Sequence, residues 1–139
     1  MIQPIHTATV NAHPVRLFRS PLTDGRPDLH WVCWGDLLNA FPLPDDLKAD
    51  FVQRLRARWP EESHTVATAE GVCVLVPHHA AQGFLAAMRE CLGMDAETDY
   101  ALGAAQALKR LTSHLTFPDG VLRYAAAAMH RWDGKGGAA

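Results

Sequence analysis

The clearest helix in the sequence is marked by apolar residues that recur every four positions. Leu47, Phe51, Leu55 and Trp59 form one stripe in an otherwise polar segment, which predicts a helix over about 45–59 with this stripe facing the core. Two aspartates stand at its start, where acidic side chains favour a helix N-terminus, and a proline follows its end.

The first third of the chain is typical of β-strands. Residues 6–12 and 15–19 predict two strands, and His13-Pro14 between them predicts a tight turn because proline fixes φ. Residues 21–28 contain two prolines and an Asp-Gly pair and predict a loop. A third strand over 29–33 should follow, and then a short helix over 36–41.

The second half predicts a hairpin and then three helices. Residues 63–68 and 71–76 should form the hairpin, and its second arm is apolar on both faces, as in a central strand. A helix should run from Pro77 to Cys91 and end at Gly93. Helices over 96–116 and 119–132 should form an antiparallel helical hairpin, since their connection is short. Their apolar faces are marked by Leu108, Leu111 and Leu115, and by Leu122, Ala125, Ala126 and Met129.

This order predicts an α+β fold. Two hairpins and an extra strand form a small antiparallel sheet, which packs against about four to five helices. The length of 139 residues fits one domain over residues 1–133, and a disordered tail should follow over 134–139. Besides the helical stripe, the expected core residues are Val74, Val76, Phe84 and Leu85.

The charge of the chain is weakly acidic, with a net charge of −2. A surface for nucleic acid should therefore lie in residues 1–60, where basic residues slightly outnumber acidic ones. The start of the chain has no signal-peptide pattern, and no apolar run approaches the ~20 residues that span a bilayer. We expect a cytoplasmic protein with no membrane contact.

The sequence shows none of the usual local signatures of catalysis or metal binding. It has no phosphate-binding glycine loop, no nucleophile elbow, no His-Glu-x-x-His pair and no Cys-x-x-Cys pair. Adjacent His78 and His79 diverge by about 100° on a helix, so a metal site would also need His64 or Cys73. We expect no metal, no cofactor and no catalytic residue, although the absence of motifs does not exclude an enzyme.

Arginines are densest at residues 54–58. Arg54 and Arg58 share a helix face with Asp46 and Asp50, so ion pairs one turn apart explain them without a ligand. The alternative is phosphate contact, to which Arg16 and Arg19 of the first hairpin would contribute. These four arginines are the candidate DNA-binding residues.

An early hairpin leads to Trp31-Val32, then to Asp36-Leu37, and later a hairpin that contains Gly71 leads into a helix at Pro77. In this pattern, residues 7–92 resemble the N-terminal domain of the BRO and KilA-N families of phage and large-virus proteins. The resemblance implies binding to double-stranded DNA and a regulatory, antirepressor-like role in phage or mobile elements. Such a module would act as a homodimer without a cofactor.

Two other functions stay open. The alanine-rich C-terminal helices could make the chain a protein-interaction module or a homodimeric structural domain, through a face that contains Ala125, Ala126, Ala128, Met129 and Trp132. Alternatively, His64, His78 and His79 could belong to a small enzyme or metal protein. A basic face over the four arginines would favour DNA, whereas a pocket around the histidines would favour a small molecule.

Overall fold

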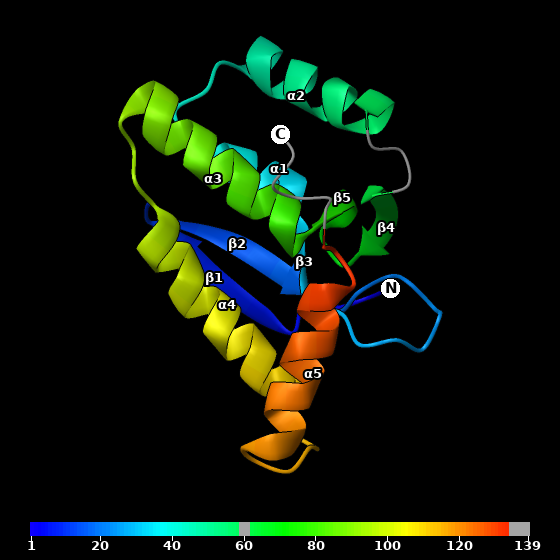
Figure 1. Cartoon of the computed structure of the whole chain (residues 1–139). Helices are drawn as coiled ribbons and strands as arrows, with labels where there is room; N and C mark the ends of the chain where they lie inside the picture. Colours follow the sequence, from blue (N-terminus) through cyan, green and yellow to red (C-terminus); the bar gives the residue numbers. More distant parts are fainter. Residues whose placement is uncertain (59–61, 134–139) are drawn as a thin grey trace.

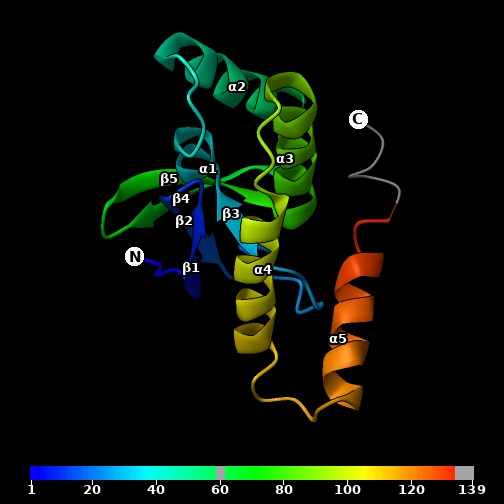
Figure 2. The same ribbon diagram turned by 90° about the vertical axis from the view of Figure 1, so that its left-hand side faces the viewer.

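The computed structural model of the chain describes residues 1–58 and 62–133 and shows a five-stranded antiparallel sheet with helices on one face (Figures 1 and 2). The strand order is β1-β2-β3-β5-β4. The predicted α+β class is confirmed. The elements are β1 His6–Val10, β2 His13–Phe18, β3 Trp31–Cys33, α1 Trp34–Asn39, α2 Asp45–Arg58, β4 His64–Thr68, β5 Gly71–Pro77, α3 His78–Leu92, α4 Glu97–Leu111 and α5 Asp119–His130.

The first turn lies two residues earlier than predicted. Asn11 and Ala12 have positive φ angles of 50° and 64°, which is the geometry of a two-residue hairpin turn, and asparagine tolerates it well. The predicted turn at His13-Pro14 is wrong, because these residues pair with Val10 and Thr9 inside β2. The missing N–H of Pro14 is tolerated there because β3 pairs only with Leu17 and Phe18.

The other strands agree well with the sequence pattern. β3 begins two residues later than expected and pairs with β2 and β5. β5 lies between β3 and β4, as predicted for a strand that is apolar on both faces. Val76 and Leu75 are fully buried on it, and Val74 is half-buried.

The main core lies between the sheet and helices α1, α3 and α4. Phe84 of α3 is 6% exposed and makes edge-to-face contacts with Trp34, Phe41 and Phe51. Leu85 and Leu55 are buried beside it. This ring cluster joins α1, α2 and α3 into one unit.

Helix α2 contacts this core only through its middle turns. Phe51 is half-buried and Leu55 is buried, but Leu47 is 38% exposed. Its predicted place in the core is therefore wrong, because the contacts of α2 with the core come from Phe51, Val52 and Leu55, and Leu47 lies one turn before them. Trp59, the fourth residue of the predicted stripe, lies outside the described residues, as does the tail over 134–139.

Helix α4 packs directly on β1. A Cβ atom at Gly103 would collide with the Cβ of Ala8, so the absence of a side chain permits this close approach. α4 ends at Leu111, five residues earlier than predicted, where the Thr112 hydroxyl donates a hydrogen bond to the carbonyl of Leu108. α3 ends, as predicted, at Gly93 with a φ of 67°.

Helix α5 runs antiparallel to α4 but stands away from it (Figure 2). The predicted apolar face of α5 is wrong in part, because Leu122 and Met129 are more than 60% exposed and Ala126 is exposed. Instead, Ala128 is buried and Tyr124 and Ala125 are half-buried. Among the described residues, no helix combines the length and the apolar character needed to cross a membrane.

Candidate functional site

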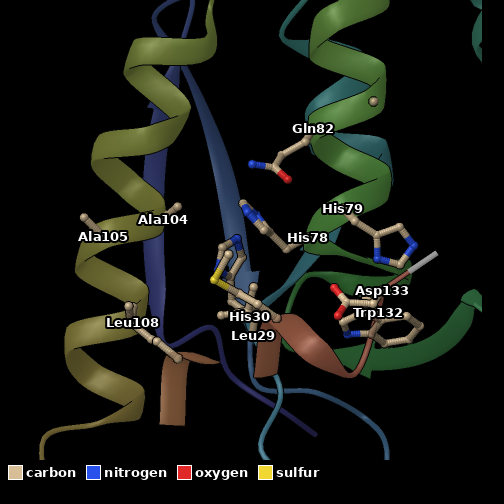
Figure 3. Close-up of a pocket in the computed structure, with 13 residues that line it drawn as sticks. Leu29, His30, His78, His79, Gln82, Ala104, Ala105, Leu108, Trp132 and Asp133 are labelled. Atoms are coloured by element: carbon tan, nitrogen blue, oxygen red, sulfur yellow. The ribbon is translucent and has the colours of Figure 1, made fainter. Parts of the chain in front are cut away.

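A cleft of about 680 Å³ lies between α3, α4 and the C-terminal helix α5 (Figure 3). Most of its wall is apolar and comes from small and flexible side chains: Leu29, Ala104, Ala105, Leu108, Ala125 and Met129. Four hydrogen-bonding side chains face them, one from the residue before β3 and three from α3: His30, His78, His79 and Gln82. The volume lies within the range of known small-molecule pockets, and a mixed lining of this kind is common in them.

Tyr100 joins two histidines of the cleft wall. Its hydroxyl lies 2.7 Å from Nε2 of His30 and 2.7 Å from Nδ1 of His78. His30 and Tyr100 are each 2% exposed, and the ring of His78 stacks on that of Tyr100. His30 directly precedes β3, His78 is the first residue of α3 and Tyr100 lies in α4, so this cluster ties three elements together.

Burial keeps all three groups of this cluster uncharged at neutral pH. It lowers the pKa of His78 to about 4, lowers the pKa of His30 and raises the pKa of Tyr100. A neutral tyrosine has one hydroxyl proton. One histidine nitrogen therefore accepts a hydrogen bond from this hydroxyl, and a nitrogen of the other histidine must donate its N–H to the phenol oxygen.

His79 points to a different part of the cleft. Its Nε2 lies 3.3 Å from Glu62 and its ring centre lies 4.7 Å from that of Trp132, whereas its buried Nδ1 has no hydrogen-bond partner among the residues that the structure describes. His64 instead contacts Trp31. The structure therefore does not bring His64, His78 and His79 together, and no three metal-ligand side chains gather anywhere in residues 1–58 and 62–133.

Helix α5 is attached to the rest of the molecule mainly by polar contacts with the loop before β3. The Tyr124 hydroxyl donates to the carbonyl of Asp28 at 2.7 Å. The carboxylate of Asp28, which is 4% exposed, accepts hydrogen bonds from the indole N–H groups of Trp132 at 2.7 Å and Trp31 at 2.9 Å. These contacts position α5 as the outer wall of the cleft.

A second attachment involves Arg131, directly after α5. Its guanidinium forms an ion pair with Asp24 and also donates to the carbonyl of Arg26 at 3.3 Å. Ala128 is the only residue of α5 that is fully buried, so these polar contacts and the ring contacts of Trp132 hold the helix in place. Such an element can open locally without unfolding the core.

The four arginines predicted to bind DNA are not equally available. Arg16 is 17% exposed, with an ion pair to Asp36 at 2.7 Å and another to Glu70 at 3.1 Å. Arg54 is exposed and pairs with Asp50 at 2.8 Å, one turn away. Arg19 is exposed, and the side chain of Arg58 lies outside the described residues. Since α1 lies between α2 and β2 (Figure 2), Arg16 and Arg54 belong to separate parts of the molecule.

Sequence reasoning identified His78 and His79 but missed His30, Gln82, Tyr100 and Asp28. His30 and Tyr100 are 70 residues apart, and nothing local indicates that they meet. Gln82 had a weak signal, because it follows His78 by four residues and must share its helix face. Comparisons of this chain with known protein families, with curated proteins and with solved structures find no match, so its chemistry rests on the geometry of the cleft.

Proposed function

We propose that this protein binds a small, mainly apolar molecule in the cleft that α5 covers. The observation that carries this proposal is the cleft itself, about 680 Å³ in volume, with an apolar wall opposite a few hydrogen-bonding side chains. This combination is typical of sites in which apolar surface supplies affinity and a few polar groups fix orientation.

The chemistry of the lining favours binding over catalysis. The described residues that line the cleft include no serine, threonine, cysteine or lysine to serve as a nucleophile. Burial lowers the pKa of His78 to about 4, which makes it a weak general base at neutral pH. A non-covalent ligand therefore fits this site better than a substrate.

Helix α5 supplies the entry route in this proposal. Its contacts with Asp24 and Asp28 are polar, so water can replace them when the helix moves outward. A ligand that touches Ala125 and Met129 would then add apolar contacts that α5 lacks in the empty protein. Binding and closure should therefore favour each other.

A titration with indole, a neutral bicyclic probe, tests the proposal. Changes in the amide and indole N–H resonances should concentrate on α3, α4, α5 and Trp132. Ala104→Phe should abolish them, since residue 104 lines the cleft, whereas Ala127→Phe on the exposed side of α5 should leave them intact. Titration to millimolar indole without localised changes would contradict the proposal.

DNA binding, with an antirepressor-like role in the cytoplasm, stays a prediction from the sequence resemblance. Its support from the arginines is limited, because Arg16 and Arg54 both have carboxylate partners. Fluorescence anisotropy with mixed duplex DNA at two salt concentrations tests it, since electrostatic binding must weaken steeply as salt rises.

A homodimer also stays a prediction. The prediction rests on the apolar face of the C-terminal helices. Part of this face is covered by other residues of the same chain, because Ala128 is buried and Trp132 packs against His79. Ala126 and Met129 of that face stay exposed, as do Leu122 and Ala127 of the same helix. Light scattering over a range of concentrations distinguishes a dimer from a monomer.

A further inference from the structure

We propose that the cleft selects an uncharged, planar heterocycle with a lactam edge, a ring carbonyl beside a ring N–H. The lactam oxygen accepts a hydrogen bond from Nε2 of His78, and the lactam N–H donates to the side-chain oxygen of Gln82. This inference rests on the proposed binding of a small molecule and adds the chemical class of the ligand.

The lining disfavours an anionic ligand. None of the described residues that line the cleft is a lysine or arginine, and Asp133 is the single carboxylate among them. The neighbouring hollow contains Arg89 and Glu97, but these pair with each other at 2.8 Å. A phosphate or carboxylate would lose its hydration in the cleft without gaining a cation.

The hydrogen-bond chain through Tyr100 determines what His78 offers to a ligand. Imidazole ordinarily prefers its proton on Nε2. With this tautomer at both histidines, His30 Nε2–H donates to Tyr100, the Tyr100 hydroxyl donates to His78 Nδ1, and His78 retains its proton on Nε2. This nitrogen makes no hydrogen bond within the described part of the chain, so His78 presents one oriented N–H donor.

Gln82 supplies the matching acceptor. It lies one helical turn after His78 on α3, and both side chains extend into the space between α3 and α4 (Figure 3). Its amide makes no hydrogen bond to any residue that the structure describes. An imidazole N–H and an amide oxygen, side by side on one helix face, complement the carbonyl and the N–H of a lactam.

The remaining walls favour a flat molecule with an apolar body. Ala104 of α4 faces His78 and Gln82 across the cleft, and Ala105 follows it (Figure 3). The small side chain of Ala104 leaves room there for a flat ring, which its methyl group can contact. Leu108 and Met129 continue this apolar surface towards α5, where the part of the ligand away from the lactam would lie.

Three probes of similar size separate this inference from simple apolar binding: 2-quinolone, N-methyl-2-quinolone and naphthalene. 2-Quinolone has the full lactam edge, the N-methyl compound lacks the N–H, and naphthalene lacks both groups. Titration calorimetry of the whole chain should show that 2-quinolone binds about tenfold more tightly than either control, since each control leaves at least one polar group of the cleft unmatched.

Gln82→Met should remove this preference without preventing the binding of naphthalene. Gln106→Met is the matched control, because Gln106 is exposed on α4 and does not line the cleft. Tyr100→Phe should also weaken the preference, because it releases the orientation of His78. If Tyr100 contributed only to stability, the ratio of the affinity for 2-quinolone to the affinity for the two controls would not change in Tyr100→Phe.

The possible failures are distinguishable. Equal affinity for the three probes, or an undiminished preference in Gln82→Met, would overturn the lactam inference and leave binding of an apolar molecule intact. Absence of binding by all three, each at its highest soluble concentration, would overturn the lactam inference and the proposed function together.

Discussion

Arg16 and Arg54 carry the same charge but differ in their surroundings. Arg16 is 17% exposed and contacts Asp36, Glu70 and Thr68, so it connects β2, α1 and the turn between β4 and β5. Arg54 is 77% exposed and has one partner on its own helix. Residue type and local spacing cannot separate these two situations, because the side-chain hydrogen-bond partners of Arg16 are 17 or more residues away along the chain.

This difference predicts unequal effects on stability. Arg16→Met should lower the free energy of unfolding by about 2–3 kcal/mol, because it leaves Asp36 without its cation in a partly buried place. Arg54→Ala should change it by about 0.5 kcal/mol or less, as expected for an exposed ion pair. Urea denaturation measures both, and equal losses would contradict the structural role assigned to Arg16.

At the scale of elements, the packing of α2 on α3 depends on a few aromatic rings. Phe84→Ala should cost about 3–5 kcal/mol, because Phe84 is buried against Trp34, Phe41 and Phe51. Leu47→Ala on the same helix as Phe51 should cost less than about 1 kcal/mol, since Leu47 is already 38% exposed. Thermal unfolding of the two variants checks this contrast, which a comparable loss in both would refute.

Helix α5 should be the least stable helix of the C-terminal half. Its amide hydrogens should exchange with solvent faster than those of α3, because Ala128 is its single fully buried residue. Tyr124→Phe removes the hydroxyl that bonds Asp28 and should accelerate exchange in α5 while leaving α3 unchanged. Hydrogen-exchange mass spectrometry detects both effects, and equal protection of the two helices would argue against an opening α5.

At the scale of the whole molecule, the buried histidines link stability to pH. Folding lowers the pKa of His78 to about 4, so between pH 6.5 and 4 the unfolded chain binds a proton that the folded chain does not. The free energy of unfolding should therefore fall as the pH falls through this window. His78 alone should contribute a loss of about 2 kcal/mol between pH 7.5 and 5.

Urea denaturation at these two pH values measures the loss. His78→Asn, whose amide can still reach the Tyr100 hydroxyl, should reduce it. The free energy of unfolding of this variant should still depend on pH to some extent, because burial also lowers the pKa of His30 and His6. An identical pH dependence in the variant and the original protein would show that His78 is not the group responsible.

The sequence predicted those parts of the molecule that local physics determines. Pro77 and Gly93 mark the two ends of α3, and the apolar pattern of β5 indicates an interior strand. Two predictions failed where nearby signals compete. Asn11-Ala12 forms the turn that His13-Pro14 was expected to form, and the mixed alanine surface of α5 is oriented by Tyr124 and Asp28 instead of by its own pattern.

The candidate site could not be predicted from local sequence patterns, for a different physical reason. It forms where the segment before β3, the start of α3, the middle of α4 and the end of α5 meet. Contact between such distant segments depends on how the sheet and helices assemble, and one sequence contains no direct signal for that distance. Only the histidine pair at 78–79 marked the place.

Gly103 has a consequence for what the cleft can admit. Its contact with Ala8 determines how closely α4 approaches β1, and the next two residues along α4 are Ala104 and Ala105 of the cleft wall. Enlarging either member of the Gly103–Ala8 pair would displace the helix, and the wall would move with it. Related proteins that differ at these two positions can therefore accept different ligands, although neither residue contacts the ligand.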